Sequence, residues 1–163
     1  MAFILAAERD PSDDVVGLFR AYEEYLKTNR ARFPESAYAL ATSEWYFNFQ
    51  DSRCPHDAWL EELRIEEPAD GARQEVRHVA IRVRLLGAYH DGYIELCYPR
   101  VFRYNLSLGN GQTGHQDWRY DEFRVAETGH LIHEIEWCGM EDVGRWIIEA
   151  SDVEFTWRPG SHA

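Results

Sequence analysis

The 163-residue sequence predicts an α+β fold, in which two N-terminal helices pack on a mostly antiparallel, meandering sheet of about six strands. Two different spacings of apolar residues along the chain predict this fold. Apolar residues recur at helical spacing between residues 10 and 45, and between residues 58 and 158 they alternate with a period of two. No repeat or linker interrupts the chain, so we expect residues 1–163 to form a single domain.

The helices are predicted from their start signals. Asp10-Pro11-Ser12-Asp13 combines an N-cap acceptor with a proline at the first helical position and acids near the positive end of the helix dipole. The apolar spacing that follows predicts a helix to about Asn29. A second, shorter helix is predicted after Pro34, because Ala37 and Leu40 begin another helical stripe.

The alternating part of the chain divides into about six strands. They are Trp59–Ile65, Val76–Leu86, Tyr93–Leu108, Asp117–Val125, Leu131–Trp137 and Trp146–Trp157. Pro99 cannot donate a hydrogen bond to a central ladder, so the third run bends there or lies at an edge. In the last run the apolar alternation shifts by one residue near Ser151, which predicts a β-bulge.

Composition and charge exclude several classes of protein. Hydrophobic residues make up 45% of the chain, enough for a packed core, and the net charge is −12. Nucleic acid is therefore an unfavourable partner, since phosphate binding draws on clustered Lys and Arg. The apolar run at residues 2–7 is too short for a signal peptide, and no run approaches a membrane span, so we expect a cytoplasmic location. Three widely spaced cysteines indicate neither a disulfide framework nor a zinc ribbon.

The last predicted hairpin carries an acidic face. Strand alternation places Glu134 and Glu136 opposite the apolar side, and the shift near Ser151 adds Glu149, Asp152 and Glu154. One interpretation is a docking surface for a basic protein. The alternative is a self-neutralised network, because arginines on neighbouring strands can pair with opposed carboxylates. The arginines placed to do so are Arg82, Arg84, Arg119 and Arg124.

Motifs that suggest catalysis have simpler explanations. The segment 109–114 matches GxGxxG, but a strand follows it where a dinucleotide site needs a helix, so we expect a hairpin loop. Cys54 and His56 are close in sequence but lack an activating relay. His133, flanked on its face by apolar residues, is expected to be a hydrogen-bonded core histidine. The absence of a catalytic signature favours a binding protein over an enzyme, and no cofactor or metal is predicted.

Three pairs of histidine and aspartate offer an alternative function. They are His56 with Asp57, His90 with Asp91, and His115 with Asp117, and each lies at a turn or a strand start. These residue types bind Zn or Fe and can act as acids and bases. If the turns bring the pairs together, the protein would be a small metal-dependent enzyme or a ligand-binding domain.

Pro55-His56-Asp57-Ala58 leads into the run Trp59–Ile65, and an alternating strand and a turn precede Tyr93–Tyr104. This pattern resembles that of small immunity-type proteins of bacterial polymorphic-toxin systems, and uncharacterised bacterial domain families show it as well. It covers about a third of the chain and carries no functional residues over. The resemblance implies a cytoplasmic protein that neutralises a toxin by binding it.

The sequence therefore predicts a non-enzymatic, acidic protein-binding module. Its expected partner is a basic protein, which the resemblance implies to be a toxin, and the acidic face of the last hairpin is the expected contact surface. A homodimer that buries surplus aromatic side chains is a further alternative.

Overall fold

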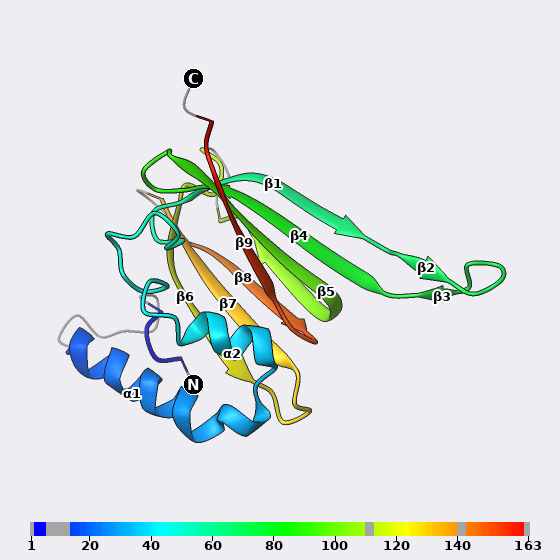
Figure 1. The fold of residues 1–163 in the computed structure, drawn as a ribbon, viewed down its shortest axis with the longest axis horizontal. Coiled ribbons are helices and arrows are strands. Elements are labelled where there is room, and N and C mark those ends of the chain that lie inside the picture. Colours follow the sequence, from blue (N-terminus) through cyan, green and yellow to red (C-terminus); the bar gives the residue numbers. More distant parts are fainter. Residues whose placement is uncertain (1, 6–13, 110–112, 140–142, 162–163) are drawn as a thin grey trace.

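The computed structural model describes residues 2–5, 14–109, 113–139 and 143–161. Two α-helices, α1 (Val15–Asn29) and α2 (Glu35–Ala41), are joined by a 3₁₀ helix, η2 (Arg30–Arg32). Both α-helices lie on one side of a large antiparallel sheet (Figure 1). The α+β class is therefore confirmed, with seven strands in the main sheet. The strands are β1 (Trp59–Glu66), β2 (Ala69–Asp70), β3 (Val76–Arg77), β4 (Val79–Leu86), β5 (Gly92–Ser107), β6 (Asp117–Val125), β7 (Leu131–Cys138), β8 (Val143–Ala150) and β9 (Glu154–Pro159).

Each helix is fixed at its N-terminus by an aspartate. The Asp14 side chain accepts a hydrogen bond of 3.1 Å from the N–H of Val16, while the predicted start at residues 10–13 lies outside the described residues. At α2 the cap comes from far along the chain, because Asp152 accepts from the N–H groups of Ser36 and Ala37, at 3.3 and 2.8 Å. In the described part of the chain, no helix has the length and apolar run that a membrane crossing needs.

The main sheet closes on itself. Its strand order is β4-β1-β6-β7-β8-β5-β9, and β5 also pairs with β4. Within the described residues, β1 and β6 share a single pair, Trp59 with Asp117. Two backbone hydrogen bonds extend this seam, from Asp57 N to Trp118 O (2.8 Å) and from Trp118 N to Ala58 O (3.0 Å). Beyond the seam the two strands diverge.

The long strand β5 runs through both halves of the sheet. Its first half pairs with β4 and β9, and its second half pairs with β8. The pairing register with β4 shifts between Tyr98 and Val101, across Pro99, and that with β8 shifts between Val101 and Arg103. The ladder is thus interrupted at Pro99, as expected for a residue that cannot donate a hydrogen bond.

Strands β8 and β9 pair with β5 one after the other along its length. Ala150, the last residue of β8, and Val153, just before β9, are both fully buried. The predicted shift in alternation near Ser151 is therefore present, but it is a break between two strands and not a β-bulge within one strand.

Helix α1 closes the edge of β6 that β1 leaves open. The Tyr22 hydroxyl accepts a hydrogen bond from the N–H of Phe123 (2.6 Å) and donates one to the carbonyl of the same residue (3.0 Å). The Tyr25 hydroxyl accepts from the N–H of Val125 (3.0 Å). Burial raises the pKa of Tyr22 well above its usual value, so its hydroxyl keeps its proton. Side chains of a helix thus replace the hydrogen bonds of a missing strand.

Beyond the core, β1 and β4 extend into a projecting hairpin. Strands β2 and β3 pair with each other in a separate two-stranded sheet, and residues 67–77 are all exposed. We call residues 66–78 the arm; it points away from the body of the protein (Figure 1). The sequence predicted a turn at residues 66–73, and the structure places an additional short strand there.

The tyrosine contacts with β6 predict a specific loss of stability. Replacing Tyr22 with Phe leaves the buried N–H and C=O of Phe123 without their hydroxyl partner, and we expect the free energy of unfolding to fall by about 1–3 kcal/mol. Tyr25→Phe removes one partly buried hydrogen bond and should cost about 0.5–1.5 kcal/mol. Urea unfolding followed by circular dichroism measures both. Equal losses in the two variants would contradict the role given to Tyr22.

Candidate functional site

The acidic face predicted on the last hairpin is not a solvent-exposed patch. Glu134 and Glu136 are 1% and 2% exposed, so the expectation that they face water is wrong. Glu149 is largely covered and pairs with Arg103 (3.2 Å) and His130 (2.9 Å). Of the two remaining acids, Asp152 caps α2 and Glu154 is exposed. The five residues therefore do not form a common surface.

Arginines on the neighbouring strands explain why these glutamates are buried. The register places Glu122 directly opposite Glu134, an unfavourable pairing of like charges. Arg124 lies between them: its Nε is 3.4 Å from Glu122, and its guanidinium also binds Glu134. Arg145 binds Glu134 from the other side. The structure therefore contains a self-neutralised network, but of the four arginines expected in it only Arg124 takes part among the described residues. The other expected arginines pair elsewhere, Arg82 with Glu66, Arg84 with Glu61 and Arg119 with Asp57.

The N-terminal segment contributes to this covering. The Glu122 carboxylate accepts hydrogen bonds from the backbone N–H groups of Phe3 (2.8 Å) and Ile4 (3.0 Å). Glu122 itself is fully buried. A carboxylate that looks from the sequence like a surface charge therefore anchors the start of the chain.

On the core side of the sheet lies a second polar network, centred on Asp121. Its carboxylate accepts hydrogen bonds from the Tyr46 hydroxyl (2.6 Å), the Trp118 indole (2.9 Å) and His133 Nε2 (2.8 Å). His133 Nδ1 is 2.6 Å from the Tyr98 hydroxyl. Burial raises the pKa of both tyrosines well above the usual value, so they remain hydroxyl donors. His133 is fully buried and hydrogen-bonded, as predicted.

This network has the chemical groups of a proton relay but no access for a substrate. Asp121, His133 and Tyr98 are at most 3% exposed. The hollow beside Asp121 and Tyr46 holds only about 10 Å³, roughly one water molecule. We therefore assign the network to the stability of the core rather than to catalysis.

Cys54 is also inaccessible for nucleophilic chemistry. It is 2% exposed, and its thiol donates to the Tyr46 carbonyl oxygen at 2.9 Å. Burial raises the pKa of Cys54 to about 12, so the reactive thiolate is absent near neutral pH. The nearby His56 is held elsewhere, by its Nδ1 at 2.5 Å from the Arg119 carbonyl oxygen.

The three histidine–aspartate pairs lie at the end of the sheet where β1 and β6 meet. Trp59 connects two of them: its indole N–H donates to Asp117 (2.7 Å), and its ring contacts the His90 ring, with centroids 4.8 Å apart. The third pair, His56 and Asp57, directly precedes this strand. Across residues 2–5, 14–109, 113–139 and 143–161, however, no group of three His, Cys, Asp or Glu side chains could hold a metal.

A pocket of about 450 Å³ opens beside Trp59. Its described lining consists of Trp59, Leu60, Thr113, Gly114, His115, Gln116 and Asp117. His115 packs on the rings of Trp137 and Trp146, with centroids about 5 Å away, and burial lowers its pKa. This shift favours the neutral form of His115. We call this hollow the Trp59 pocket.

Sequence reasoning identified the histidines and aspartates of this end but not Trp59. The signal was available: Trp59 opens a strand between two of the pairs and belongs to the segment that carries the resemblance to immunity-type proteins. Its partners lie about 30 and 60 residues further along the chain. The pairing of β1 with β4 brings His90 to it, and the closure of the sheet brings Asp117.

Comparison of the chain with models of protein families, with curated proteins and with solved structures gave no match. The interpretation of the chain therefore depends on its own geometry.

Removing the Asp121 carboxylate should destabilise the fold strongly. In Asp121→Ala three buried donors lose their acceptor, and we expect the free energy of unfolding to fall by about 3–5 kcal/mol. Asp51→Ala provides the matched control, because Asp51 pairs with Arg53 near the surface (2.8 Å), and such a pair contributes about 0–1 kcal/mol. Chemical denaturation measures both. A loss below 1 kcal/mol in Asp121→Ala would show that the network is not central to stability.

The raised pKa of Cys54 predicts that its thiol is unreactive in the folded protein. At pH 8 we expect a thiol reagent such as dithionitrobenzoate to modify Cys54 only after denaturation. Cys54→Ala should lower the number of thiols that react in denaturant and leave the reaction of the folded protein unchanged. A rapid native reaction that disappears in this variant would contradict the assignment.

Proposed function

We propose that the protein is a non-enzymatic, acidic protein-binding module, and that it binds an extended segment of a basic partner along the free edge of β1. The observation that carries the proposal is this edge. Strand β1 pairs with β4 from Trp59 to Glu66, but among the described residues no strand pairs with its other side after Trp59. A free strand edge presents backbone N–H and C=O groups that a partner strand can bind.

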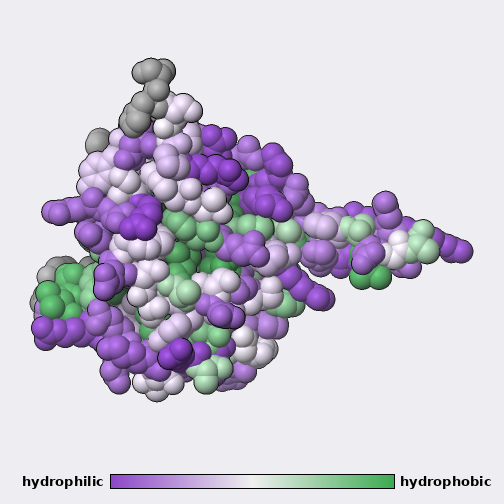
Figure 2. Space-filling model, in the orientation of Figure 1, coloured by the Kyte–Doolittle hydropathy of each residue, from purple (hydrophilic) through white to green (hydrophobic). Residues whose placement is uncertain are grey.

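The arm makes this edge longer and more accessible. It continues the direction of β1 beyond the body, and Figure 2 shows it as a separate, solvent-surrounded projection. Two large apolar side chains are exposed here: Ile65 (42%), just before the arm, and Val76 (58%), within it. None of residues 66–78 belongs to the buried core. The core does not require the arm, and this favours a role in contacts with another molecule.

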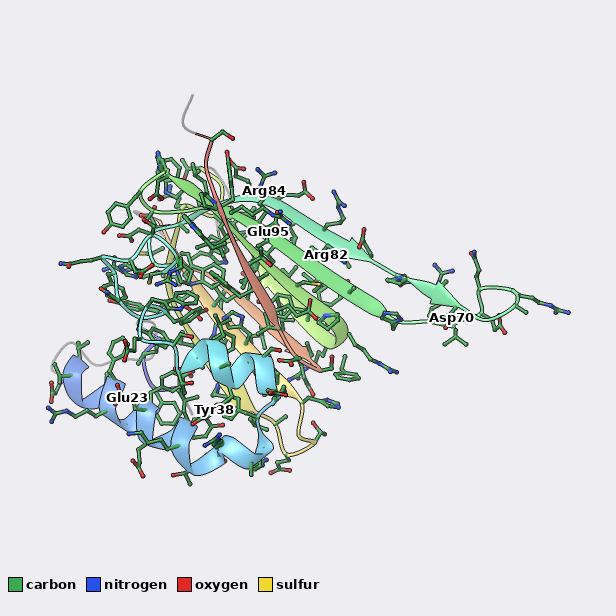
Figure 3. The ribbon with its side chains drawn as sticks, viewed as in Figure 1. Glu23, Tyr38, Asp70, Arg82, Arg84 and Glu95 are labelled. Atoms are coloured by element: carbon green, nitrogen blue, oxygen red, sulfur yellow. The ribbon has the colours of Figure 1, made fainter. Side chains whose placement is uncertain are left out.

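The overall charge of the chain, more than that of the edge alone, favours a basic partner. Four glutamates follow the line of β1 and the start of the arm: Glu61, Glu62, Glu66 and Glu67. Arg84 binds Glu61 (3.8 Å), Arg64 binds Glu62 (2.8 Å), Arg82 binds Glu66 (3.4 Å) and Arg77 binds Glu67 (3.4 Å), so each of the four glutamates has an arginine partner. Figure 3 shows Asp70 in the outer part of the arm and Arg82 near its base. The acids oppose pairing with an acidic or a like strand, and the net charge of −12 attracts a basic chain.

The resemblance to immunity-type proteins suggests a toxin as the kind of partner for this proposal. A protein of that type neutralises a toxin by direct binding, and a basic toxin would meet both the edge and the overall charge of this chain. The contact surface proposed here replaces the hairpin face that the sequence suggested, because Glu134 and Glu136 are buried.

Charge reversal on the edge tests the proposal. We would select binders from a display library of random linear peptides on the wild-type protein and measure their affinity by fluorescence anisotropy. Lys- and Arg-rich extended peptides should be enriched, and Glu61→Lys with Glu62→Lys and Glu66→Lys should weaken their binding by about tenfold or more.

A matched triple variant on the helices separates edge binding from general attraction. Glu23, Glu24 and Glu35 are exposed, and their replacement by Lys changes the net charge by the same amount. This variant should retain most of the affinity, and circular dichroism checks the fold of both proteins. Equal weakening in the two variants would overturn the edge as the contact surface. A stable dimer by light scattering that the edge variant abolishes would instead make a second copy the occupant.

A further inference from the structure

Trp59 is an exposed aromatic side chain in a fixed orientation. It is 48% exposed, its indole N–H is bound to the Asp117 carboxylate at 2.7 Å, and the His90 ring contacts it from the side. A buried or mobile tryptophan could not offer one ring face to a ligand in this way. Because the orientation is set by protein contacts, a ligand that stacks on the ring does not have to order it.

The charge of the Trp59 pocket selects the kind of ligand. Among its described lining residues, Asp117 is a carboxylate and no Lys or Arg is present. His115 favours its neutral form, because burial on Trp137 and Trp146 lowers its pKa. A phosphate or carboxylate would meet a negative charge here without a compensating cation, so the presence of Thr113 and Gly114 in the lining does not make it a phosphate site.

We infer that the Trp59 pocket binds an organic cation, a quaternary ammonium or guanidinium group. The face of a tryptophan attracts cations through its quadrupole, and the adjacent Asp117 carboxylate supplies the opposite charge. An inorganic cation such as Ca²⁺ requires several oxygen ligands, and in the described chain no such group of acidic side chains surrounds Asp117. The volume of about 450 Å³ accommodates a group of several heavy atoms.

Backbone strain around Trp59 supports a binding role for this end of the sheet. Asp57, His90 and Gln116 have positive φ angles of 62°, 56° and 63°. Asp and His adopt such conformations more readily than most residues, so Gln116 is the strained position of the three, and strain of this kind is common at functional sites. All three residues lie next to Trp59 in sequence or belong to the loops that contact it or line its pocket.

The cation can have two sources. It can be a free small molecule, or it can be the Arg or Lys side chain of a bound peptide, since Trp59 opens the strand whose free edge is the proposed docking surface. The pocket does not depend on that docking surface, because its residues and charge are present without a bound strand. The two sources share the same recognition chemistry, and titrations with different probes distinguish them.

The test is a titration of the full chain with tetramethylammonium chloride and, separately, with N-acetyl-arginine methylamide. Two-dimensional NMR of indole N–H groups reports the response, and Trp59→Leu assigns the resonance of Trp59. We expect saturable shifts of this resonance, which sodium chloride at equal ionic strength does not produce. Response to the ammonium salt alone indicates a free cation, and response to the arginine derivative indicates a protein side chain.

Three variants make the outcome decisive. Trp59→Leu should abolish the saturable response of the remaining pocket resonances, and Asp117→Asn should weaken affinity by about tenfold through loss of the charge. Asp57→Asn makes the same charge change outside the pocket lining, at a positive φ that asparagine tolerates, and should bind normally. Absence of saturable shifts, or equal affinity in Asp117→Asn and the wild type, would overturn the site. Loss of peptide binding in the edge variant with normal tetramethylammonium binding would leave the pocket in place while overturning the edge.

Discussion

The fold depends on a carboxylate buried at its centre. Placing Asp121 in the core costs several kcal/mol unless donors surround it, and they do: a tyrosine from the segment after α2, a tryptophan from β6 and a histidine from β7. Through His133 the network also reaches Tyr98 on β5. The Asp121 carboxylate has all of its hydrogen-bond donors only when these elements are in place together. The network therefore favours one arrangement of strands and loops over other compact arrangements.

Much of the fold could be predicted from the sequence, because the features concerned are local. The change from helical to two-residue rhythm located the helices and the main strands, and proline chemistry placed the interruption of the β5 ladder at Pro99. The step in alternation near Ser151 appears in the structure as the break between β8 and β9. The apolar neighbours of His133 were sufficient to predict its burial. Each of these features is determined by residues within one run of the chain.

What could not be predicted depends on contacts between distant segments. Alternation shows that Glu134 and Glu136 share a face, but it does not show whether that face meets water. Arg145 on a neighbouring strand and the N-terminal segment bound to Glu122 cover it. The same limit applies to the candidate site, since the single pair of Trp59 with Asp117 depends on the closure of the sheet. Local patterns identified the right chemical groups at that end without showing how they combine.

One geometric feature generates both the free edge and the pocket. Where β1 and β6 meet, their pairing fixes Trp59 against Asp117; one residue later they separate, and β1 continues alone toward the arm. The edge of β6 is closed by Tyr22 and Tyr25, whereas no comparable set of side-chain hydrogen bonds closes β1 in the described structure. An open strand is a hazard for aggregation, and its glutamates oppose pairing with similar chains. A strand edge protected by charge differs from one covered by side chains, because a strand of opposite charge can still pair with it. The open edge and the exposed tryptophan beside it are thus the two features on which the proposed binding of basic groups rests.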